Sequence, residues 1–254
     1  MAIYSANIEL LYTQHEKFED RIRAAAADGF KYVEMWMSSL QDVASLAAVA
    51  KEVGVQFSSC LAEPRFTFNQ PGPVDLNVFY DGLKQSIANA KVLGSPRVVL
   101  GSGMGFPGRK RAPSLDVLVE AFKEACNIAA EHDIQLVLEP VNTRVDHPGA
   151  LLDRTADGVY IAKKLNHPNF KLLYDIYHSS VEGEDVLSIL KNDIDWIGYI
   201  QLADTNGRHE PGTGDVNWEK VIQAVDASGY LDPIGLEFYP SKDTTEAIKY
   251  IRTL

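Results

Sequence analysis

The stretch WIGYIQLADTNGRHEPGTGDVN, residues 196–217, joins a short apolar run to a long polar loop. The run at 196–200 is typical of a buried β-strand. The loop at 201–217 places charged and amide side chains between glycines, and it exceeds the roughly 4–6 residues of a plain connection. We therefore interpret the stretch as a buried strand that opens into a functional loop. The alternative is a solvated connection that happens to be polar.

The same order, a short apolar run followed by a helix-like segment, recurs along the whole chain. The predicted strands lie at residues 3–8, 32–37, 55–61, 97–100, 134–138, 170–174, 196–200 and 234–236. The predicted helices lie at residues 18–27, 41–53, 76–93, 114–131, 155–165, 184–190, 218–228 and 244–251. The strands are continuous apolar runs, as expected for parallel strands that are buried on both faces.

Strand–helix alternation of this kind predicts an α/β fold with a parallel sheet. Eight units in 254 residues predict a single-domain (β/α)8 TIM barrel over residues 1–254, with the active site at the C-terminal ends of the strands. We call this end of the barrel the mouth. The alternative, an open doubly wound sheet, normally shows a glycine-rich fingerprint after its first strand. The segment SANIELLY at 5–12 has none.

Composition narrows the choice of partners. The net charge is −11, which argues against nucleic acid or an anionic membrane as the main partner. No apolar run reaches about 18 residues, and the N-terminus lacks the pattern of a signal peptide. Cys60 and Cys126 lie in apolar surroundings without metal-type spacing, so we expect reduced core thiols in a cytoplasmic protein. The expected partner is a small molecule, and homo-oligomerisation stays open.

Four consecutive predicted strands each finish with an oxygen-bearing side chain. These residues are Glu139, Asp175, Gln201 and Glu237. Carboxylates that are held close together repel one another unless a cation neutralises them. Carboxylate and amide oxygens suit Mg²⁺ or Mn²⁺ better than soft metals. The pattern therefore predicts a divalent metal at the mouth, whereas the alternative is that strand ends are polar because they are wet.

Further candidates surround this cluster. His178 follows Asp175 by three residues and is expected to donate to a substrate oxygen or to orient a ligand. Arg208 and His209 are expected to hold an anionic or hydroxyl-rich substrate, because arginine presents a rigid fork of donors. A salt-bridged loop is the alternative for this pair. Glu34 also ends a strand. We favour a structural role for it, and the alternative is that it contacts a metal ligand without binding the metal.

Three local features complete these expectations. Phe66 and Phe68 either form an apolar wall over the site or pack ordinarily. The basic run at 109–111 is interpreted as a solvated loop rather than an anion contact. Ser114 is expected to cap the helix that follows it, because its hydroxyl can accept from free N–H groups.

Four motifs resemble one known family. They are EPVN at 139–142, YDIYH at 174–178, IQLADTNGRHEPGTGDVNW at 200–218 and GLEFYP at 235–240. They are similar to the xylose-isomerase-like TIM barrels, and most similar to the hydroxypyruvate isomerase group, which includes the 2-oxo-tetronate isomerases. The resemblance implies a divalent metal, Mn²⁺ or Mg²⁺, on the four strand-end residues. It also implies that Glu139 and Glu237 act as an acid/base pair, with His178 and Arg208 near the substrate.

The expected activity is that of a metal-dependent aldose–ketose type isomerase, an intramolecular oxidoreductase. Its substrate would be a small hydroxy-carbonyl compound such as hydroxypyruvate, a 2-oxo-tetronate or a ketose, reacting through an enediolate with the two glutamates as acid and base. A ketose 3-epimerase is the alternative, although related epimerases usually have histidine where this chain has Gln201. The loop AEPRFTFNQPGPVD at 62–75 differs from the hydroxypyruvate isomerase pattern, so the exact substrate stays open.

Three other classes fit less well. A sugar dehydratase related to inosose dehydratase is a further enzymatic option. A non-catalytic sugar-binding barrel is disfavoured by the intact glutamate pair. A DNA-repair nuclease related to endonuclease IV is disfavoured by the acidic charge and by the few histidines near the cluster.

Overall fold

The computed structural model describes residues 2–63, 75–105 and 110–254. Within these residues, eight parallel strands close into a barrel in sequence order, and β1 pairs with β8 to complete the ring. The strands are β1 (Tyr4–Asn7), β2 (Tyr32–Glu34), β3 (Gln56–Leu61), β4 (Arg97–Gly101), β5 (Gln135–Glu139), β6 (Phe170–Asp175), β7 (Ile197–Leu202) and β8 (Ile234–Leu236). The predicted (β/α)8 barrel is therefore confirmed.

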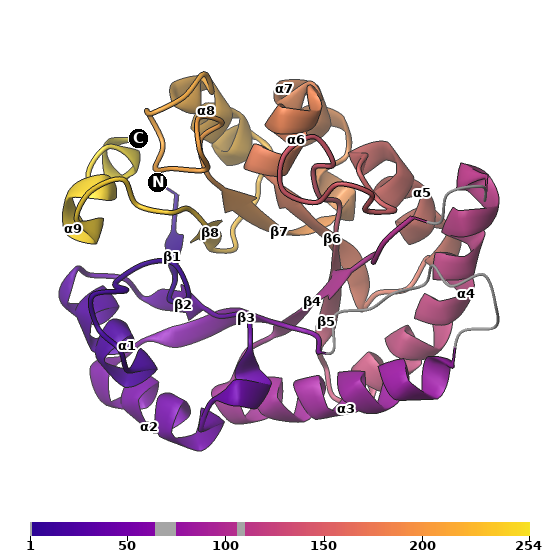
Figure 1. Ribbon diagram of the computed structural model, residues 1–254, viewed down its shortest axis with the longest axis horizontal. Coiled ribbons are helices and arrows are strands. Elements are labelled where there is room, and N and C mark those ends of the chain that lie inside the picture. Colours follow the sequence, from indigo (N-terminus) through magenta and orange to yellow (C-terminus); the bar gives the residue numbers. More distant parts are fainter. Residues whose placement is uncertain (1, 64–74, 106–109) are drawn as a thin grey trace.

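Helices form an outer ring around the strands (Figure 1). The α-helices are α1 (Phe18–Ala27), α2 (Val43–Val53), α3 (Leu76–Leu93), α4 (Arg111–Ala130), α5 (Thr155–Leu165), α6 (Ile176–Glu182), α7 (Val186–Asn192), α8 (Trp218–Ala227) and α9 (Thr244–Ala247). Short 3₁₀ turns occur at η1 (Ser38–Leu40), η2 (Ile194–Trp196) and η3 (Ile251–Thr253). The hydroxyl of Tyr4 donates to the carbonyl of Ile251, so the first strand and the last turn are in contact.

Two expectations about helices were wrong. Helix α4 begins at Arg111, not after Ser114, and the Ser114 hydroxyl donates to the carbonyl of Lys110 instead of capping the helix. Arg111 therefore opens a helix, where it forms ion pairs with Asp153 and Asp157, and does not lie in a free loop. Helix α6 was not predicted; it begins directly after β6 and leaves α7 to start later than expected.

The barrel interior explains why polar side chains meet at the mouth. An apolar layer inside the barrel consists of Val99, Val137, Leu173 and Tyr199. Side chains two residues apart on a strand point to the same side. Glu139, Asp175 and Gln201 each lie two residues beyond a member of this layer, so they point into the barrel one layer nearer its mouth. Asp175 and Gln201 are direct partners in the β6–β7 register.

Other expectations can be placed briefly. Cys60 and Cys126 are buried and free, as predicted. Among the described residues, no helix is both long and apolar enough to cross a membrane. Phe66, Phe68 and Arg109 lie outside the described residues.

Candidate active site at the barrel mouth

Asp175 ends β6 and also begins α6. Its Oδ1 accepts from the backbone N–H of Tyr177 at 2.8 Å, which makes the carboxylate the N-cap of this helix. The cap fixes the side chain, so that Oδ2 faces the neighbouring polar groups of the mouth. His178 lies in the first turn of the same helix, and its ring is buried beside the carboxylate.

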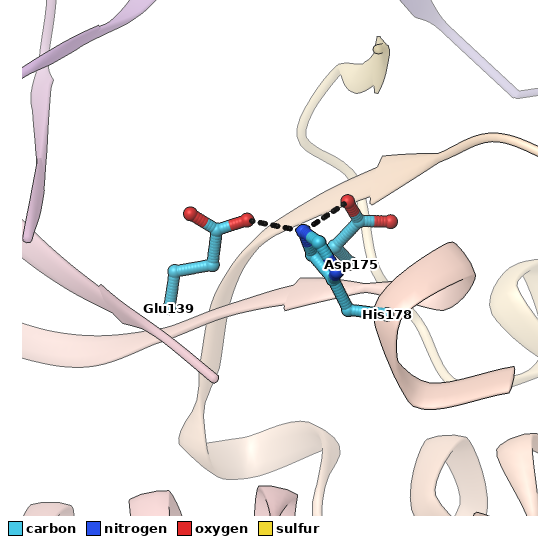
Figure 2. A group of neighbouring side chains, drawn as sticks. All are labelled: Glu139, Asp175 and His178. Atoms are coloured by element: carbon cyan, nitrogen blue, oxygen red, sulfur yellow. Dashed lines mark ion pairs between the residues drawn. The ribbon is translucent and has the colours of Figure 1, made fainter. Parts of the chain in front are cut away.

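Glu139, Asp175 and His178 form a compact cluster that could hold a metal ion (Figure 2). One potential ligand atom from each lies within 4.8 Å of the other two. Nε2 of His178 is 3.6 Å from Oε1 of Glu139 and 3.6 Å from Oδ2 of Asp175. Figure 2 shows the imidazole between the two carboxylates.

The hydrogen bonds of His178 decide what its ring can do. Its Nδ1 lies 3.1 Å from the backbone N–H of Asn142 and 2.7 Å from the side-chain Nδ2 of the same residue. Both Asn142 groups are donors, so Nδ1 is the acceptor and Nε2 carries the proton of the neutral ring. Burial, and then the charge of Arg208, lowers the pKa of His178 well below its usual value. Nε2–H is therefore a neutral donor and lacks the free lone pair that a metal ligand needs.

Glu237 follows β8 and is held from both sides. Its Oε1 accepts from Nε1 of Trp36 at 2.6 Å and lies 3.5 Å from Nδ2 of Asn7. Its Oε2 accepts from Nη2 of Arg208 at 2.5 Å, and the same Nη2 lies 3.2 Å from Oδ2 of Asp175. The guanidinium thus places one positive charge between two carboxylates of the mouth.

Arg208 was expected to bind the substrate, with a salt bridge as the alternative. It is only 9% exposed, and its guanidinium lies over the ring of Tyr177 at 5.0 Å. The salt-bridge alternative is therefore present in the structure. The residue has a φ of 56°, a strained value for a side chain other than glycine, and its buried Nε has no partner among the described residues. Burial would lower its pKa, but Glu237 and Asp175 raise that pKa overall.

The side-chain amide of Gln201 has a hydrogen-bond partner for its nitrogen but none, among the described residues, for its oxygen. Its Nε2 donates to Oε1 of Glu34 at 2.8 Å. Its Oε1 is buried and has no hydrogen-bond partner among the described residues. A buried carbonyl oxygen without a partner costs about 1–3 kcal/mol. An oxygen-ligated cation beside the carboxylates of Asp175 and Glu237 would satisfy it, so the residues present fit a hard divalent metal.

The carboxylates of the mouth repel one another, and this shifts their pKa values. Burial, and then the charge of Glu237, raises the pKa of Glu34. Burial also raises the pKa of Asp175, while Arg208 lowers it and Glu237 raises it further. Carboxylates with raised pKa values in a polar cleft are typical of functional sites.

Sequence reasoning missed several residues of this site. Asn7 and Glu34 are partners in the β1–β2 register, and both reach the mouth. Glu34 had been noted as a strand end, with a structural role favoured, so Asn7 is the member of this pair that was missed; β1 ends at Asn7, within the strand that was predicted at 3–8. Trp36 and Asn142 gave no comparable signal, because each acts through a contact with a residue far away in the chain.

The long loop after β7 is anchored by its own carboxylate. Asp204 accepts from Nε1 of Trp218 and from the backbone N–H of Gly212, both at 2.8 Å. Burial would raise the pKa of Asp204, but these hydrogen bonds lower it overall. His209 is tied to the same region, because its Nδ1 lies 2.6 Å from the carbonyl of Tyr239. These contacts fix the loop, and the loop in turn fixes the position of Arg208 at the mouth.

Comparison with known proteins assigns the barrel to a family. The model of the xylose isomerase-like TIM barrel matches residues 22–254. The chain belongs to this family. Within the xylose isomerase-like barrels, it is 32% identical to a 2-oxo-tetronate isomerase of Cupriavidus necator, over 99% of this chain and 98% of the relative. It is 29% identical to the hydroxypyruvate isomerase of Escherichia coli K12, over 99% of this chain and 98% of the relative.

A solved structure agrees with the fold. An AP endonuclease of family 2 from Brucella melitensis superimposes with a TM-score of 0.89 and 22% identity, covering 100% of this chain and 99% of that chain. Identity at this level carries the xylose isomerase-like fold alone. The resemblance predicted from the four motifs is confirmed by the family match and by the two isomerase relatives.

Proposed function

We propose that this protein is a metal-dependent isomerase of a small hydroxy-carbonyl compound of the hydroxypyruvate or 2-oxo-tetronate type. The observation that carries the proposal is the buried, unpartnered amide oxygen of Gln201 beside the carboxylates of consecutive strands. Two relatives of matching length, named as isomerases of such compounds, support it.

The proposed metal ligands are all oxygen donors. They are Glu139, Asp175, Gln201 and Glu237. Such a set suits Mn²⁺ or Mg²⁺. A bound cation would supply electrostatic stabilisation of negative charge that develops on substrate oxygens. His178 is left out of the set, because its Nε2 carries a proton and Asn142 occupies Nδ1.

Glu139 and Glu237 are the proposed acid/base pair. One glutamate takes a proton from a substrate carbon, and the other returns a proton. Trp36 and Arg208 hold the carboxylate of Glu237, and this fixes the direction from which it can reach a substrate. A positioned carboxylate of this kind contributes about 10²–10⁴-fold to a rate. Return of the proton to the adjacent carbon completes an aldose–ketose isomerisation.

Three further residues are proposed to bind the substrate. Nε2–H of His178 can donate to a substrate oxygen, because the neutral ring has its proton on that atom. Arg208 can bind a substrate carboxylate, since its Nε has no partner among the described residues. His209 belongs to the same loop, and we propose that it contacts the outer part of the substrate.

Epimerisation is the second candidate outcome of the same chemistry. If the proton returns to the opposite face of the same carbon, the product is an epimer and the enzyme a ketose 3-epimerase. The amide of Gln201 and the names of the two relatives favour isomerisation. A dehydratase or a non-catalytic sugar-binding barrel has less support from these observations. A cytoplasmic location and homo-oligomerisation stay predictions.

The test is proton exchange followed by NMR in D₂O with Mn²⁺ present. Hydroxypyruvate, 2-oxo-tetronates and common ketoses are incubated separately with the protein. We expect deuterium at the carbon next to the carbonyl and conversion of a hydroxypyruvate-like compound or a 2-oxo-tetronate. Exchange with inversion in a ketose would identify an epimerase. Metal-loaded protein that exchanges no proton in any of these compounds would overturn the proposal.

A further inference from the structure

Glu34 accepts a hydrogen bond from the side-chain amide of Gln201, and this bond decides which way the amide faces. The side chain of Gln201 offers a donor at one end and an acceptor at the other. Nδ2 of Asn7 also donates to Oε1 of Glu34, so this oxygen is an acceptor, and the end of Gln201 that meets it is Nε2–H₂. The oxygen of Gln201 is consequently turned away from Glu34 and left without a partner among the described residues.

Glu34 is itself held firmly in place. Nδ2 of Asn7 donates to its Oε1 at 3.0 Å. The hydroxyls of Tyr199 and Ser59 donate to its Oε2. The Tyr199 hydroxyl is supported in turn by Ser58 at 2.8 Å, deeper inside the barrel. Both oxygens of the Glu34 carboxylate are therefore held by donors.

The neighbouring strand leaves space for this contact. Gly235 on β8 is the register partner of Gln201. A Cβ atom at Gly235 would overlap the carboxylate of Glu34 and lie 2.7 Å from Cγ of Gln201. Glycine at 235 therefore allows the two side chains to meet across the barrel.

We propose that Glu34 is a positioning residue for the metal site. It turns the amide of Gln201 so that an oxygen, and not an NH₂ group, faces the carboxylates of Asp175 and Glu237. The inference rests on the proposed metal site, and it adds a residue that touches neither metal nor substrate. Outer groups that orient a ligand typically change metal affinity by about 10–100-fold when they are replaced.

The first measurement is the affinity of the purified, metal-stripped protein for Mn²⁺, by calorimetry and by the EPR signal of free Mn²⁺. Glu34→Gln keeps the shape of the side chain but offers both an oxygen and an NH₂ group, so the Gln201 amide can turn either way. We expect Mn²⁺ binding to weaken by about 10–100-fold. Glu182→Gln is the matched control, because it removes a buried carboxylate that binds Thr143 and Arg144. It should leave the affinity unchanged.

A double-mutant cycle separates positioning from simple attraction by the charge of Glu34. In a Gln201→Ala background the amide is gone, so Glu34→Gln should cause no further loss of Mn²⁺ affinity. A loss of equal size in both backgrounds would show that the charge of Glu34 acts directly, and would overturn the positioning role.

The exchanged pair provides a second route if Glu34→Gln does not fold. In Glu34→Gln combined with Gln201→Glu, the amide at 34 donates to the carboxylate at 201, which still presents an oxygen to the mouth. Mn²⁺ affinity close to that of the wild type supports the inference, and affinity as low as that of Gln201→Ala overturns it. If the wild type itself binds no Mn²⁺, the proposed metal site fails. If the wild type binds and Glu34→Gln binds equally well, only the role of Glu34 fails.

Discussion

The loop after β7 and the barrel mouth both contain buried carboxylates, but they hold them in opposite ways. In the loop, the oxygens of Asp204 and Glu210 accept from indole, hydroxyl and backbone donors, and both pKa values are lowered overall although burial would raise them. In the mouth, Glu34 and Asp175 lie close to Glu237, and burial together with that charge raises their pKa values. The carboxylates of the loop therefore stabilise the fold, whereas the ionised carboxylates of the mouth are unfavourable in the fold by themselves.

This difference distinguishes carboxylates that stabilise the fold from side chains that are available for a ligand. A carboxylate whose hydrogen bonds are complete has no capacity left for a ligand. In the mouth, the oxygen of Gln201 and Nε of Arg208 are buried without partners among the described residues. Natural proteins break the usual rules of polar satisfaction mainly at functional sites. Variants in the two regions should therefore behave differently.

The largest expected effect is on the rate of the reaction, in the mouth. Glu139→Gln and Glu237→Gln each keep an oxygen for the metal but lose the base. We expect each Mn²⁺-loaded variant to lose about 10²–10⁴-fold in turnover. Steady-state kinetics and metal content are measured on the same samples. Near-normal turnover of a loaded variant would remove that glutamate from the mechanism.

Arg208→Ala should give the largest effect on stability. Without the guanidinium, Asp175 and Glu237 repel each other, and removing one partner of a buried ion pair costs about 3–5 kcal/mol. Urea unfolding of metal-stripped protein should show this loss, and saturating Mn²⁺ should reduce it because a cation again separates the carboxylates. Catalysis should fall as well.

The control for Arg208→Ala is Arg23→Ala. Arg23 is an exposed arginine that pairs with the exposed carboxylates of Asp20 and Glu52. Such pairs contribute about 0–1 kcal/mol, and Mn²⁺ should not change the difference from wild type. If the deficit of Arg208→Ala were the same with and without Mn²⁺, Arg208 would serve mainly to pack against Tyr177.

The loop should respond to Asp204→Asn through stability. An amide at 204 brings an extra NH₂ donor towards Nε1 of Trp218 and the N–H of Gly212, which are donors themselves. We expect a loss of about 1–3 kcal/mol in the free energy of unfolding. Mn²⁺ affinity should stay close to that of the wild type, because the Asp204 carboxylate accepts hydrogen bonds from its own loop and from Trp218. A greater loss of Mn²⁺ affinity than of stability would break the distinction between the two regions.

The sequence predicts most of the fold, because strands that are buried on both faces leave continuous apolar runs, and a polar residue lies at or next to the end of each of the last four. It predicts the members of the carboxylate cluster for the same reason. Helix α6 was not predicted because Asp175 has two roles. It was recognised as a strand-end metal ligand, but not as the N-cap of the helix that follows. Arg208 was assigned to the substrate, with a salt bridge as the alternative, and its partners could not be named because Asp175 and Glu237 are distant in the chain and meet it only in the closed barrel.

The smallest effect concerns the pH dependence of stability in the loop, and it tests the contrast most directly. Burial would raise the pKa of Glu210, but the hydroxyl and backbone N–H of Ser241 lower it overall. The ordinary value is about 4.3. A glutamate with a lowered pKa in the folded protein binds protons less readily there than in the unfolded chain, so it stabilises the fold above about pH 4.3, and this contribution is lost as the pH falls through the lowered value.

Glu210→Gln removes that contribution. Between pH 5 and 7 the variant should be less stable than the wild type by the free energy of one or two hydrogen bonds, about 0.5–1.5 kcal/mol each. This difference in the free energy of unfolding should become smaller as the pH falls below about 4. Glu246→Gln is the control, because Glu246 is an exposed partner of Lys249 and should change little at any pH. A Glu210→Gln deficit that widened in acid would mean that this carboxylate is held as those of the mouth are, and the division between a supporting loop and a reactive mouth would not hold at Glu210.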